Sequence, residues 1–325
     1  MYLRYCGIMP NYKCSAACRH CLYACSPSRT GGYMDEATMK EVCATLIQNG
    51  CKRVHIGGGE PFLDYEGLLT LLKTCVDYGI LVDYIETNAS WVVSEKDTTQ
   101  RLRQIKKLGV KALCISVDPY HAEYIPYGRP LSLANVCTEE NFVYFIWQER
   151  FLRMLQSIDA ETAHSRQELE QNLSPSYIYD TANAYGLKIG GRAINIEEEY
   201  HSRKPIGDIL TAAGDSPCND LLATNHFHVD MHGNFIPSGC TGIIIPLKEL
   251  TTNLDTSRYP AFEALLNGGI NALHKLAISH KFIPNPDGYT SKCALCFHIR
   301  HHLSGISNAF PELDSEHYEH SLRDY

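Results

Sequence analysis

Three cysteines near the start of the chain have the spacing of a metal centre. Cys14, Cys18 and Cys21 follow the pattern C-x-x-x-C-x-x-C. Zinc sites usually take four protein ligands that complete a tetrahedron, whereas three thiolates on one short loop suit a four-iron cluster whose fourth iron takes a non-protein ligand. Cys25 is near enough in the sequence to act as a fourth ligand and close the site, so both arrangements are open at this point.

Four more cysteines form a second candidate centre in the last third of the chain. They are Cys218, Cys240, Cys293 and Cys296, and the last two form a C-x-x-C pair. Four thiolates can hold a structural zinc ion or a four-iron cluster in which the protein binds every iron.

Bulk composition narrows the class of protein. The 325 residues carry a net charge of −8, and the basic residues are scattered rather than clustered, which argues against a nucleic-acid partner. Apolar runs such as residues 142–147 are too short to span a membrane, and the first residues lack the apolar core of a signal peptide. We therefore expect a cytoplasmic protein, where reducing conditions favour metal binding over disulfides at clustered cysteines.

Short β-rich segments alternate with amphipathic helical segments between residues 2 and 200. The predicted strands are 2–8, 53–57, 81–86, 111–117, 142–147 and 187–196, and the predicted helices are 35–49, 65–78, 94–108, 149–172 and 177–185. The first strands begin about thirty residues apart, which is the length of a repeating βα unit. Six such units predict an α/β fold with a partial (β/α)6 barrel of the TIM type. Right-handed crossovers would bring the carboxyl ends of its strands to one rim.

The pattern changes after about residue 205, where prolines and glycines mark a boundary. We expect residues 1–207 to form the barrel and residues 208–325 to form a small C-terminal α+β module that carries the second cysteine set. The pattern in this module predicts a β-hairpin over 226–230 and 234–237 and a helix over 261–273. His226 and His228 point to the same side of the first hairpin strand, and we expect them to be exposed rather than to bind a metal.

Polar motifs follow the predicted strands at the rim. Gly58-Gly59-Glu60-Pro61 follows the second strand, Glu86-Thr87-Asn88 ends the third, Ser116-Val117-Asp118 ends the fourth, and Gly190 to Asn195 lies on the sixth. With the cysteine triad, and with His20 where an aromatic residue precedes the last cysteine, this series resembles the radical S-adenosylmethionine (radical SAM) superfamily over residues 2–200. Each motif alone has a simpler explanation, such as a tight turn or a helix cap. Their order after successive strands makes the resemblance specific.

The resemblance implies a set of cofactor contacts. Cys14, Cys18 and Cys21 would bind a [4Fe–4S] cluster, and Gly58, Gly59 and Glu60 would contact the amino group of SAM. Thr87 and Asn88 would lie near the cofactor, Ser116 and Asp118 near its ribose, and Asn195 near its adenine. Arg150 would pair with the SAM carboxylate, and the alternative for it is a surface position at the start of a helix.

The implied chemistry is reductive cleavage of SAM to a 5′-deoxyadenosyl radical, which removes a hydrogen atom from the substrate. A reductant such as flavodoxin or ferredoxin would supply the electron. Cys6 and Cys114 are candidate hydrogen donors if they face the barrel interior, with core packing as the alternative, and His121 is a candidate substrate contact.

The second cysteine set resembles the twitch module, a shortened form of the SPASM extension found in some radical SAM enzymes. This resemblance implies an auxiliary [4Fe–4S] cluster, with a four-thiolate zinc site as the alternative. We expect maturation of a ribosomally made peptide, by epimerisation, cross-linking or oxidation. The alternatives are dehydrogenation or rearrangement of a small molecule, with the auxiliary cluster as electron acceptor, and a non-catalytic iron–sulfur or zinc protein.

Overall fold

The computed structural model describes residues 1–323 and divides the chain into two compact units. The first unit comprises residues 1–18, 25–186 and 224–233. The described part of the second comprises residues 19–24, 187–223 and 234–323. The predicted boundary at residue 207 falls inside a segment of the second unit.

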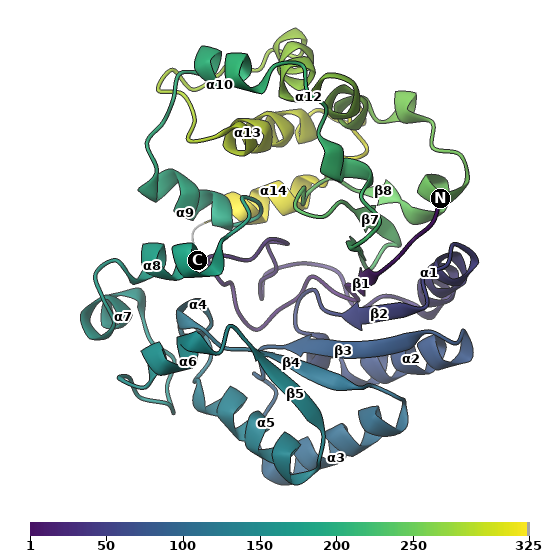
Figure 1. Cartoon of the computed structure of the whole chain (residues 1–325), viewed down its shortest axis with the longest axis vertical. Helices are drawn as coiled ribbons and strands as arrows, with labels where there is room; N and C mark the ends of the chain where they lie inside the picture. Colours follow the sequence, from purple (N-terminus) through teal and green to yellow (C-terminus); the bar gives the residue numbers. More distant parts are fainter. Residues whose placement is uncertain (324–325) are drawn as a thin grey trace. The chain divides into compact units, whose positions relative to one another are not determined.

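The first unit is an α/β structure built on parallel strands. These are β1 (Cys6–Ile8), β2 (Arg53–Ile56), β3 (Leu81–Thr87), β4 (Ala112–Ser116), β5 (Val143–Trp147) and β6 (Phe227–Val229). Their order is β5-β4-β3-β2-β1-β6, with every pair parallel (Figure 1). Within the described residues the sheet does not close on itself, so the predicted partial barrel is confirmed.

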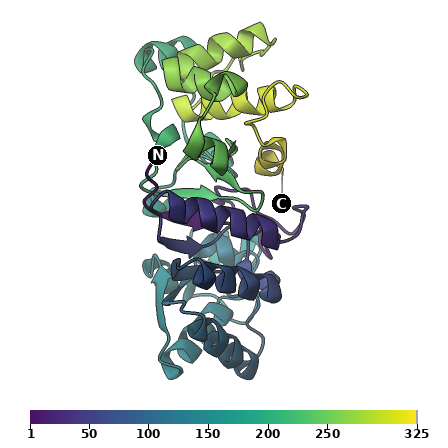
Figure 2. The same cartoon turned by 90° about the vertical axis from the view of Figure 1, so that its right-hand side faces the viewer.

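Helices follow the strands as the βα repeat predicts. They are α1 (Glu36–Gln48), η1 (Pro61–Leu63), α2 (Tyr65–Asp77), α3 (Glu95–Lys107), α4 (Pro119–Ala122), α5 (Gly128–Glu139), α6 (Arg150–Leu155), α7 (Arg166–Asn172) and α8 (Tyr177–Tyr185). The long helices begin where a side chain can accept from a free backbone N–H: Asp35 caps α1, Asp64 caps α2 and Ser94 caps α3. Figure 2 shows α1, α2 and α3 in successive rows along the same side of the sheet.

The two faces of the sheet differ in chemistry because side chains alternate along each strand. Cys6, Ile8, Val54 and Ile56 are completely buried, and the Cys6 thiol lies beside Cys43 of α1, which places this face against the helices. The opposite face, called here the inner face, carries Gly7 of β1, His55 of β2, Tyr84 and Glu86 of β3 and Cys114 of β4. These residues occupy paired positions on neighbouring strands: Gly7 with His55, His55 with Tyr84, and Glu86 with Cys114.

Two predicted elements are wrong. Residues 187–196 form no strand, because a turn at Gly190 and Gly191 leads directly into α9 (Ala193–Tyr200); the sixth parallel strand is β6, which pairs with β1. The predicted helix 149–172 is interrupted between α6 and α7. A new helix starts at Ser165 because its side chain and that of Glu168 form a reciprocal capping box.

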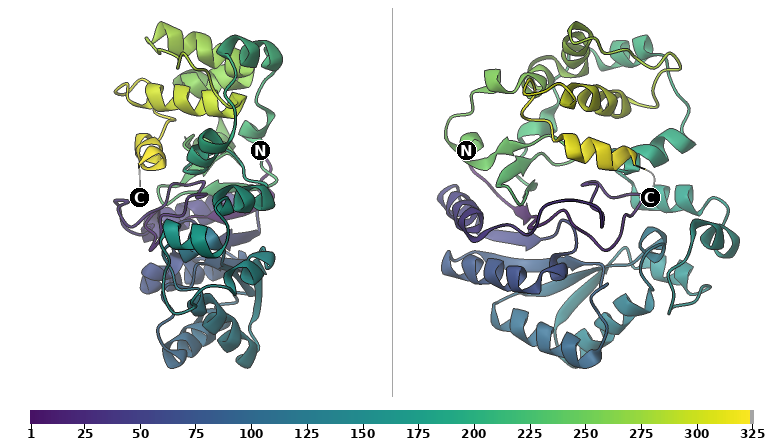
Figure 3. Two further views of the ribbon diagram at one scale, coloured as in Figure 1. Left: turned by 90° about the vertical axis from the view of Figure 1, so that its left-hand side faces the viewer. Right: turned by 180° about the vertical axis from the view of Figure 1, so that it is seen from behind.

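The second unit is mainly helical. Its remaining elements are α10 (Ile206–Ala213), η2 (Asn219–Leu222), β7 (Asn234–Ile236), β8 (Ile245–Pro246), α11 (Leu247–Thr252), η3 (Thr256–Arg258), α12 (Pro260–Ser279), α13 (Lys292–Ser304) and α14 (Ser315–Leu322). Strands β7 and β8 are antiparallel, and α13 packs against both α12 and α14 (Figure 3). The predicted helix 261–273 lies within α12, but Gly268 (φ −151°) and Gly269 (φ +58°) are not helical and divide α12 into two helices. No helix in residues 1–323 combines the length and hydrophobicity needed to cross a bilayer.

Candidate active site

Glu60 is the centre of a buried hydrogen-bond network at the carboxyl ends of β2 and β3. Its side chain is completely buried and caps η1 by accepting from the Phe62 N–H at 3.1 Å. It also accepts from the Thr87 hydroxyl at 3.0 Å and from the Asn88 N–H at 2.8 Å. Burial raises the pKa of Glu60 to about 7, although these three donors favour the carboxylate and oppose the shift.

The loop before Glu60 depends on two glycines. Gly58 has φ of +103°, a conformation that L side chains rarely adopt. A Cβ atom on Gly59 would lie 2.0 Å from the Lys13 carbonyl oxygen and 2.9 Å from Asn11 Oδ1. The backbone N–H groups of Gly59 and Glu60 donate to the carbonyls of Asn11 and Lys13. The Gly-Gly-Glu motif therefore packs directly against the segment that leads into Cys14.

Asn88 connects the Glu60 network to the cysteine triad. While its backbone N–H binds Glu60, its side-chain amide lies 3.4 Å from Cys14 Sγ and 3.2 Å from the Ser15 hydroxyl. An N–H donor aimed at a ligand sulfur stabilises negative charge on that sulfur and tunes the cluster it binds. The structure thus brings the predicted residues Glu60, Thr87 and Asn88 together with Cys14.

The motif after β4 forms a second buried group. Asp118 is completely buried and caps α4, with Oδ1 accepting from the His121 N–H at 3.0 Å and Oδ2 lying 2.7 Å from His121 Nδ1. The Tyr185 hydroxyl donates to the same Oδ2 at 2.5 Å. Burial opposes protonation of His121, but the Asp118 carboxylate and the Cys18 sulfur outweigh it and raise its pKa well above the usual range. The side chain of Asp118 therefore holds His121 and Tyr185.

The other predicted SAM contacts lie in varied surroundings. Ser116 is half-buried at the end of β4. Arg150 is exposed at the start of α6, where it donates to the Gln148 side chain at 2.7 Å. Asn195 lies on α9, not on a strand, and its side chain donates to the Ser321 carbonyl at 2.9 Å.

Cys21 and His20 belong to segment 19–24, which is grouped with the second unit. Within that unit the Gly190-Gly191 turn packs against the Cys21 segment. The Arg192 N–H donates to the Cys21 carbonyl at 3.0 Å. A Cβ atom on Gly191, which has φ of +51°, would lie 2.2 Å from the same carbonyl oxygen. This turn supports the backbone of the last triad cysteine.

On the inner face, the titratable residues Glu86 and Cys114 lie side by side on neighbouring strands. Glu86 and Cys114 occupy paired positions, and Cys114 in turn pairs with Phe145 of β5. The Glu86 side chain is partly accessible (42%), yet desolvation by its surroundings raises its pKa to about 7. Desolvation and the nearby Glu86 carboxylate raise the pKa of Cys114 well above the usual range, so its thiol keeps its proton.

The second cysteine set lies around a buried arginine. Burial raises the pKa of Cys240 to about 12, and the neighbouring thiols Cys296, Cys218 and Cys293 add to the shift. Arg300 of α13 opposes it, because this guanidinium is 5% exposed and lies beside the four thiols. Arg300 is fixed in place by hydrogen bonds from Nη1 to the Thr241 carbonyl at 2.8 Å and to the Tyr318 hydroxyl at 3.0 Å.

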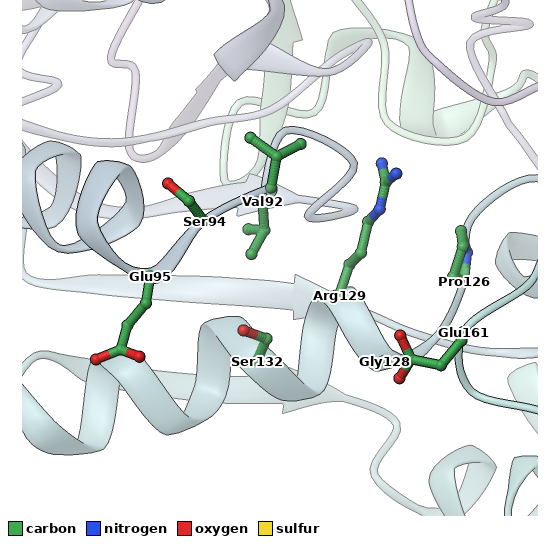
Figure 4. A pocket seen from close by; sticks show the side chains of 9 residues that line it. Val92, Ser94, Glu95, Pro126, Gly128, Arg129, Ser132 and Glu161 are labelled. Carbon is green, nitrogen blue, oxygen red and sulfur yellow. The ribbon is translucent and has the colours of Figure 1, made fainter.

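A surface pocket of about 520 Å³ lies beside the loop that follows β3 (Figure 4). Its lining includes Val92, Ser94, Arg129, Ser132 and Glu161 and none of the residues predicted to contact SAM. Arg129 donates to the Ser90 carbonyl at 2.6 Å. Arg129 therefore supports the loop after Asn88, and the pocket lies outside the predicted cofactor site.

Residues 8–137 match the family model described as Radical SAM superfamily. This part of the chain is a radical SAM domain, the catalytic domain of enzymes that use S-adenosylmethionine in radical chemistry, as the motifs predict. The alternative of a non-catalytic metal protein is therefore not supported.

Over 137 residues the chain is 31% identical to "Putative peptide biosynthesis protein YydG" from Bacillus subtilis (strain 168). The matched segment covers 42% of this chain and 41% of that relative, so it spans less than half of the relative's length.

Two solved structures align with most of the chain at low sequence identity. BtrN in complex with AdoMet and 2-DOIA is 15% identical, with 83% of this chain and 89% of that chain covered and a TM-score of 0.45. Streptococcus suis SuiB bound to the precursor peptide SuiA is 14% identical, with coverage of 91% and 76% and a TM-score of 0.38.

Several residues of the site could not be identified from the sequence. Asn11, Tyr185 and Arg300 lie outside the motifs, and no local pattern distinguishes them from other polar residues. His55 precedes the Gly-Gly-Glu motif by a few residues. Its place in a short strand of buried residues, where a polar side chain needs a partner, was a signal that could have identified it.

Proposed function

We propose that this protein is a radical SAM enzyme that modifies a ribosomally made peptide. The observation that carries the proposal is the series of hydrogen bonds from buried Glu60 through Asn88 to half-buried Cys14. These bonds join the Gly-Gly-Glu loop, the end of β3 and the first triad cysteine.

The residues present suit a [4Fe–4S] cluster on Cys14, Cys18 and Cys21 with SAM beside it. Asn11 Oδ1 is buried without a hydrogen-bond partner in the described residues, next to Gly59, where a Cβ atom would not fit. A buried acceptor in a glycine-lined cradle suits the amino group of SAM. When bound, the two groups supply a 5′-deoxyadenosyl radical that removes a hydrogen atom, after a donor such as flavodoxin or ferredoxin has reduced the cluster.

The residues of this chain would hold these groups and shield them. Glu60 orders Thr87 and Asn88, and Asn88 directs an amide at Cys14 Sγ. Ser116 remains our proposed ribose contact, and His121, held by Asp118, remains a proposed substrate contact. Contacts of Arg150 and Asn195 with SAM stay predictions.

Two observations favour a peptide as substrate. The relative YydG is named for peptide biosynthesis. In addition, β5 leaves Val143, Phe145 and Trp147 exposed by 65%, 38% and 49%, and Phe145 lies in the same row as Cys114. Exposed aromatic and aliphatic side chains of this kind suit the contact surface of a peptide.

Cys114 is our candidate hydrogen donor. Its sulfur belongs to the inner face, and its raised pKa preserves the S–H bond. Transfer of that hydrogen atom to a peptide carbon radical would form a C–H bond and leave a thiyl radical, which one electron from the reductant and one proton would restore. Cys6 is not proposed for this role because it faces Cys43 on the helical side.

We further propose that Cys218, Cys240, Cys293 and Cys296 bind an auxiliary four-iron cluster. The four thiols raise one another's pKa, so they lie close enough together to share one metal centre. The buried Arg300 guanidinium beside them favours their thiolate forms, which are the ligating forms. The resemblance to the twitch module favours a four-iron cluster over zinc.

Iron analysis and a peptide assay test the proposal. The reconstituted protein should hold about eight irons; C14A/C18A/C21A should keep about four and lose SAM cleavage, and C293A/C296A should also keep about four.

A precursor peptide encoded by a neighbouring gene, incubated with the wild-type enzyme in D₂O, should gain one deuterium per modified residue. The C114A variant should still release 5′-deoxyadenosine but add no deuterium. SAM cleavage without any change in the peptide would contradict the peptide assignment, and zinc at the second site would contradict the auxiliary cluster.

A further inference from the structure

We propose that His55, His226 and His228 form a binding site for one divalent transition-metal ion such as zinc on the inner face of the first unit. No cysteine contributes to this site. The inference does not depend on the proposed function, because it rests on the geometry of three histidines that the radical SAM motifs do not include.

Strand pairing brings these histidines together. Gly7 of β1 pairs with His55 of β2 on one side and with His228 of β6 on the other, and His226 directly precedes β6. Each histidine offers one ring nitrogen, and the three nitrogens lie within 4.8 Å of one another. The sequence pattern predicts that His226 and His228 lie on a hairpin strand; the pairing of β6 with β1 brings both rings beside His55.

The ring spacing is that of a tetrahedral site. The three pairs of ring centroids are 5.4, 5.2 and 5.1 Å apart. With metal–nitrogen bonds of ~2.0–2.1 Å and tetrahedral angles, the centroids of three imidazoles around zinc are about 5 Å apart. Small rotations of the rings are therefore enough to direct the nitrogens at one ion.

Gly7 makes room for this arrangement. A Cβ atom on Gly7 would lie 2.3 Å from His228 Cδ2 and 2.6 Å from His55 Cε1. The two rings meet over the bare backbone of β1, so any side chain at this position would push them apart.

His55 is oriented like a metal ligand. Its ring is 1% exposed and stacks on Tyr84 and on Tyr5, with centroids 4.9 and 5.5 Å away. Nε2 lies 3.6 Å from the Glu86 carboxylate, and Nδ1 is buried with no hydrogen-bond partner among residues 1–323. A carboxylate behind one ring nitrogen, with the other nitrogen free to bind, is the usual support for a metal-binding histidine.

The protonation state of His55 and His228 suits the binding of a cation. Burial, and then the neighbouring His226, lower the pKa of His55 to about 3; burial, His55 and His226 lower the pKa of His228 well below the usual range. Both rings are therefore neutral at physiological pH, which is the ligating form. Three imidazoles suit zinc, nickel or copper, and they leave a fourth position for water.

Zinc binding to the iron-loaded full-length protein tests the inference. After titration with ZnCl₂ and gel filtration, we expect about one zinc per chain above the iron content, with nitrogen neighbours at ~2.0 Å in zinc X-ray absorption rather than sulfur at ~2.3 Å. His228→Gln and His226→Gln should each weaken zinc binding at least tenfold. The matched control His201→Gln, at a surface histidine 47% exposed, should bind as the wild type does.

Circular dichroism and iron content separate a lost site from a misfolded chain. His226 lies outside β6, so its substitution should leave both unchanged while zinc binding falls; that result supports the site. Sulfur-only coordination in the wild type, no zinc uptake, or wild-type affinity in folded His226→Gln protein would each overturn the inference.

Discussion

Replacing Glu60 with glutamine should abolish a specific pH dependence of stability. Glu60 is completely buried, and burial raises its pKa from 4.5 to about 7 in the folded protein. The folded chain therefore holds this proton more tightly than the unfolded chain does. The stability contributed by the group is complete below about pH 4.5 and is lost as the pH rises to about 7. E60Q has nearly the same shape but does not titrate.

The magnitude follows from the two pKa values. Each pH unit between them is worth about 1.4 kcal/mol, so the free energy of unfolding of the wild type should fall by about 3 kcal/mol relative to E60Q between pH 4.5 and pH 7. E60A behaves differently, because it leaves the Phe62 N–H, the Asn88 N–H and the Thr87 hydroxyl without their acceptor. Each such loss costs about 1–3 kcal/mol, so E60A should be destabilised at every pH.

Urea unfolding of the cluster-free chain, monitored by Trp91 fluorescence in a Trp147→Phe background, measures this difference. Trp91 is a suitable probe because its indole donates to Thr87 Oγ1 at 2.9 Å, and Thr87 donates to Glu60. E86Q is the matched control: Glu86 also has a pKa of about 7, but its 42% accessible side chain should give a smaller slope. A difference between wild type and E60Q that stays constant from pH 4.5 to 7.5 would refute the reasoning.

Two further substitutions test the surroundings of the clusters, and one tests the Cys21 turn. Asn88→Ala removes the amide 3.4 Å from Cys14 Sγ and should lower the midpoint potential of the SAM-binding cluster in a redox titration followed by EPR; an unchanged midpoint would contradict this contact. Arg300→Gln removes a buried charge beside the second set; a unit charge about 7 Å away is worth about 2 kcal/mol at a dielectric constant of about 20, so the auxiliary potential should fall by on the order of 100 mV. Gly191→Ala should reduce iron loading because its Cβ would lie 2.2 Å from the Cys21 carbonyl, whereas Gly186→Ala, with φ of +64° but nothing within 4 Å, controls for backbone strain alone. Equal iron loading in the two glycine variants would rule out a supporting role for the Gly191 turn.

The sequence alone was informative wherever a local pattern reflects a local cause. Helices α1, α2 and α3 lie within a residue or two of their predicted bounds, because apolar periodicity marks the buried side and Asp35, Asp64 and Ser94 begin each helix by capping it. The Gly-Gly-Glu motif after β2 and the Thr87-Asn88 pair after β3 were recognisable because the rim of a parallel sheet collects such motifs. The radical SAM domain was therefore predictable from residues close together in the sequence.

Only the tertiary structure determined which distant segments meet. Strand β6 was predicted, but its pairing with β1 was not, because parallel pairing of Phe227 with Cys6 leaves no trace in the local pattern of either strand. That pairing brings His228 and His226 beside His55, and the packing of α8 brings Tyr185 to Asp118. The apolar periodicity of the sequence indicates that a side chain is buried. The free energy of burying a polar side chain, however, depends on which hydrogen-bond partner lies beside it. That partner is set by contacts between residues far apart in the chain.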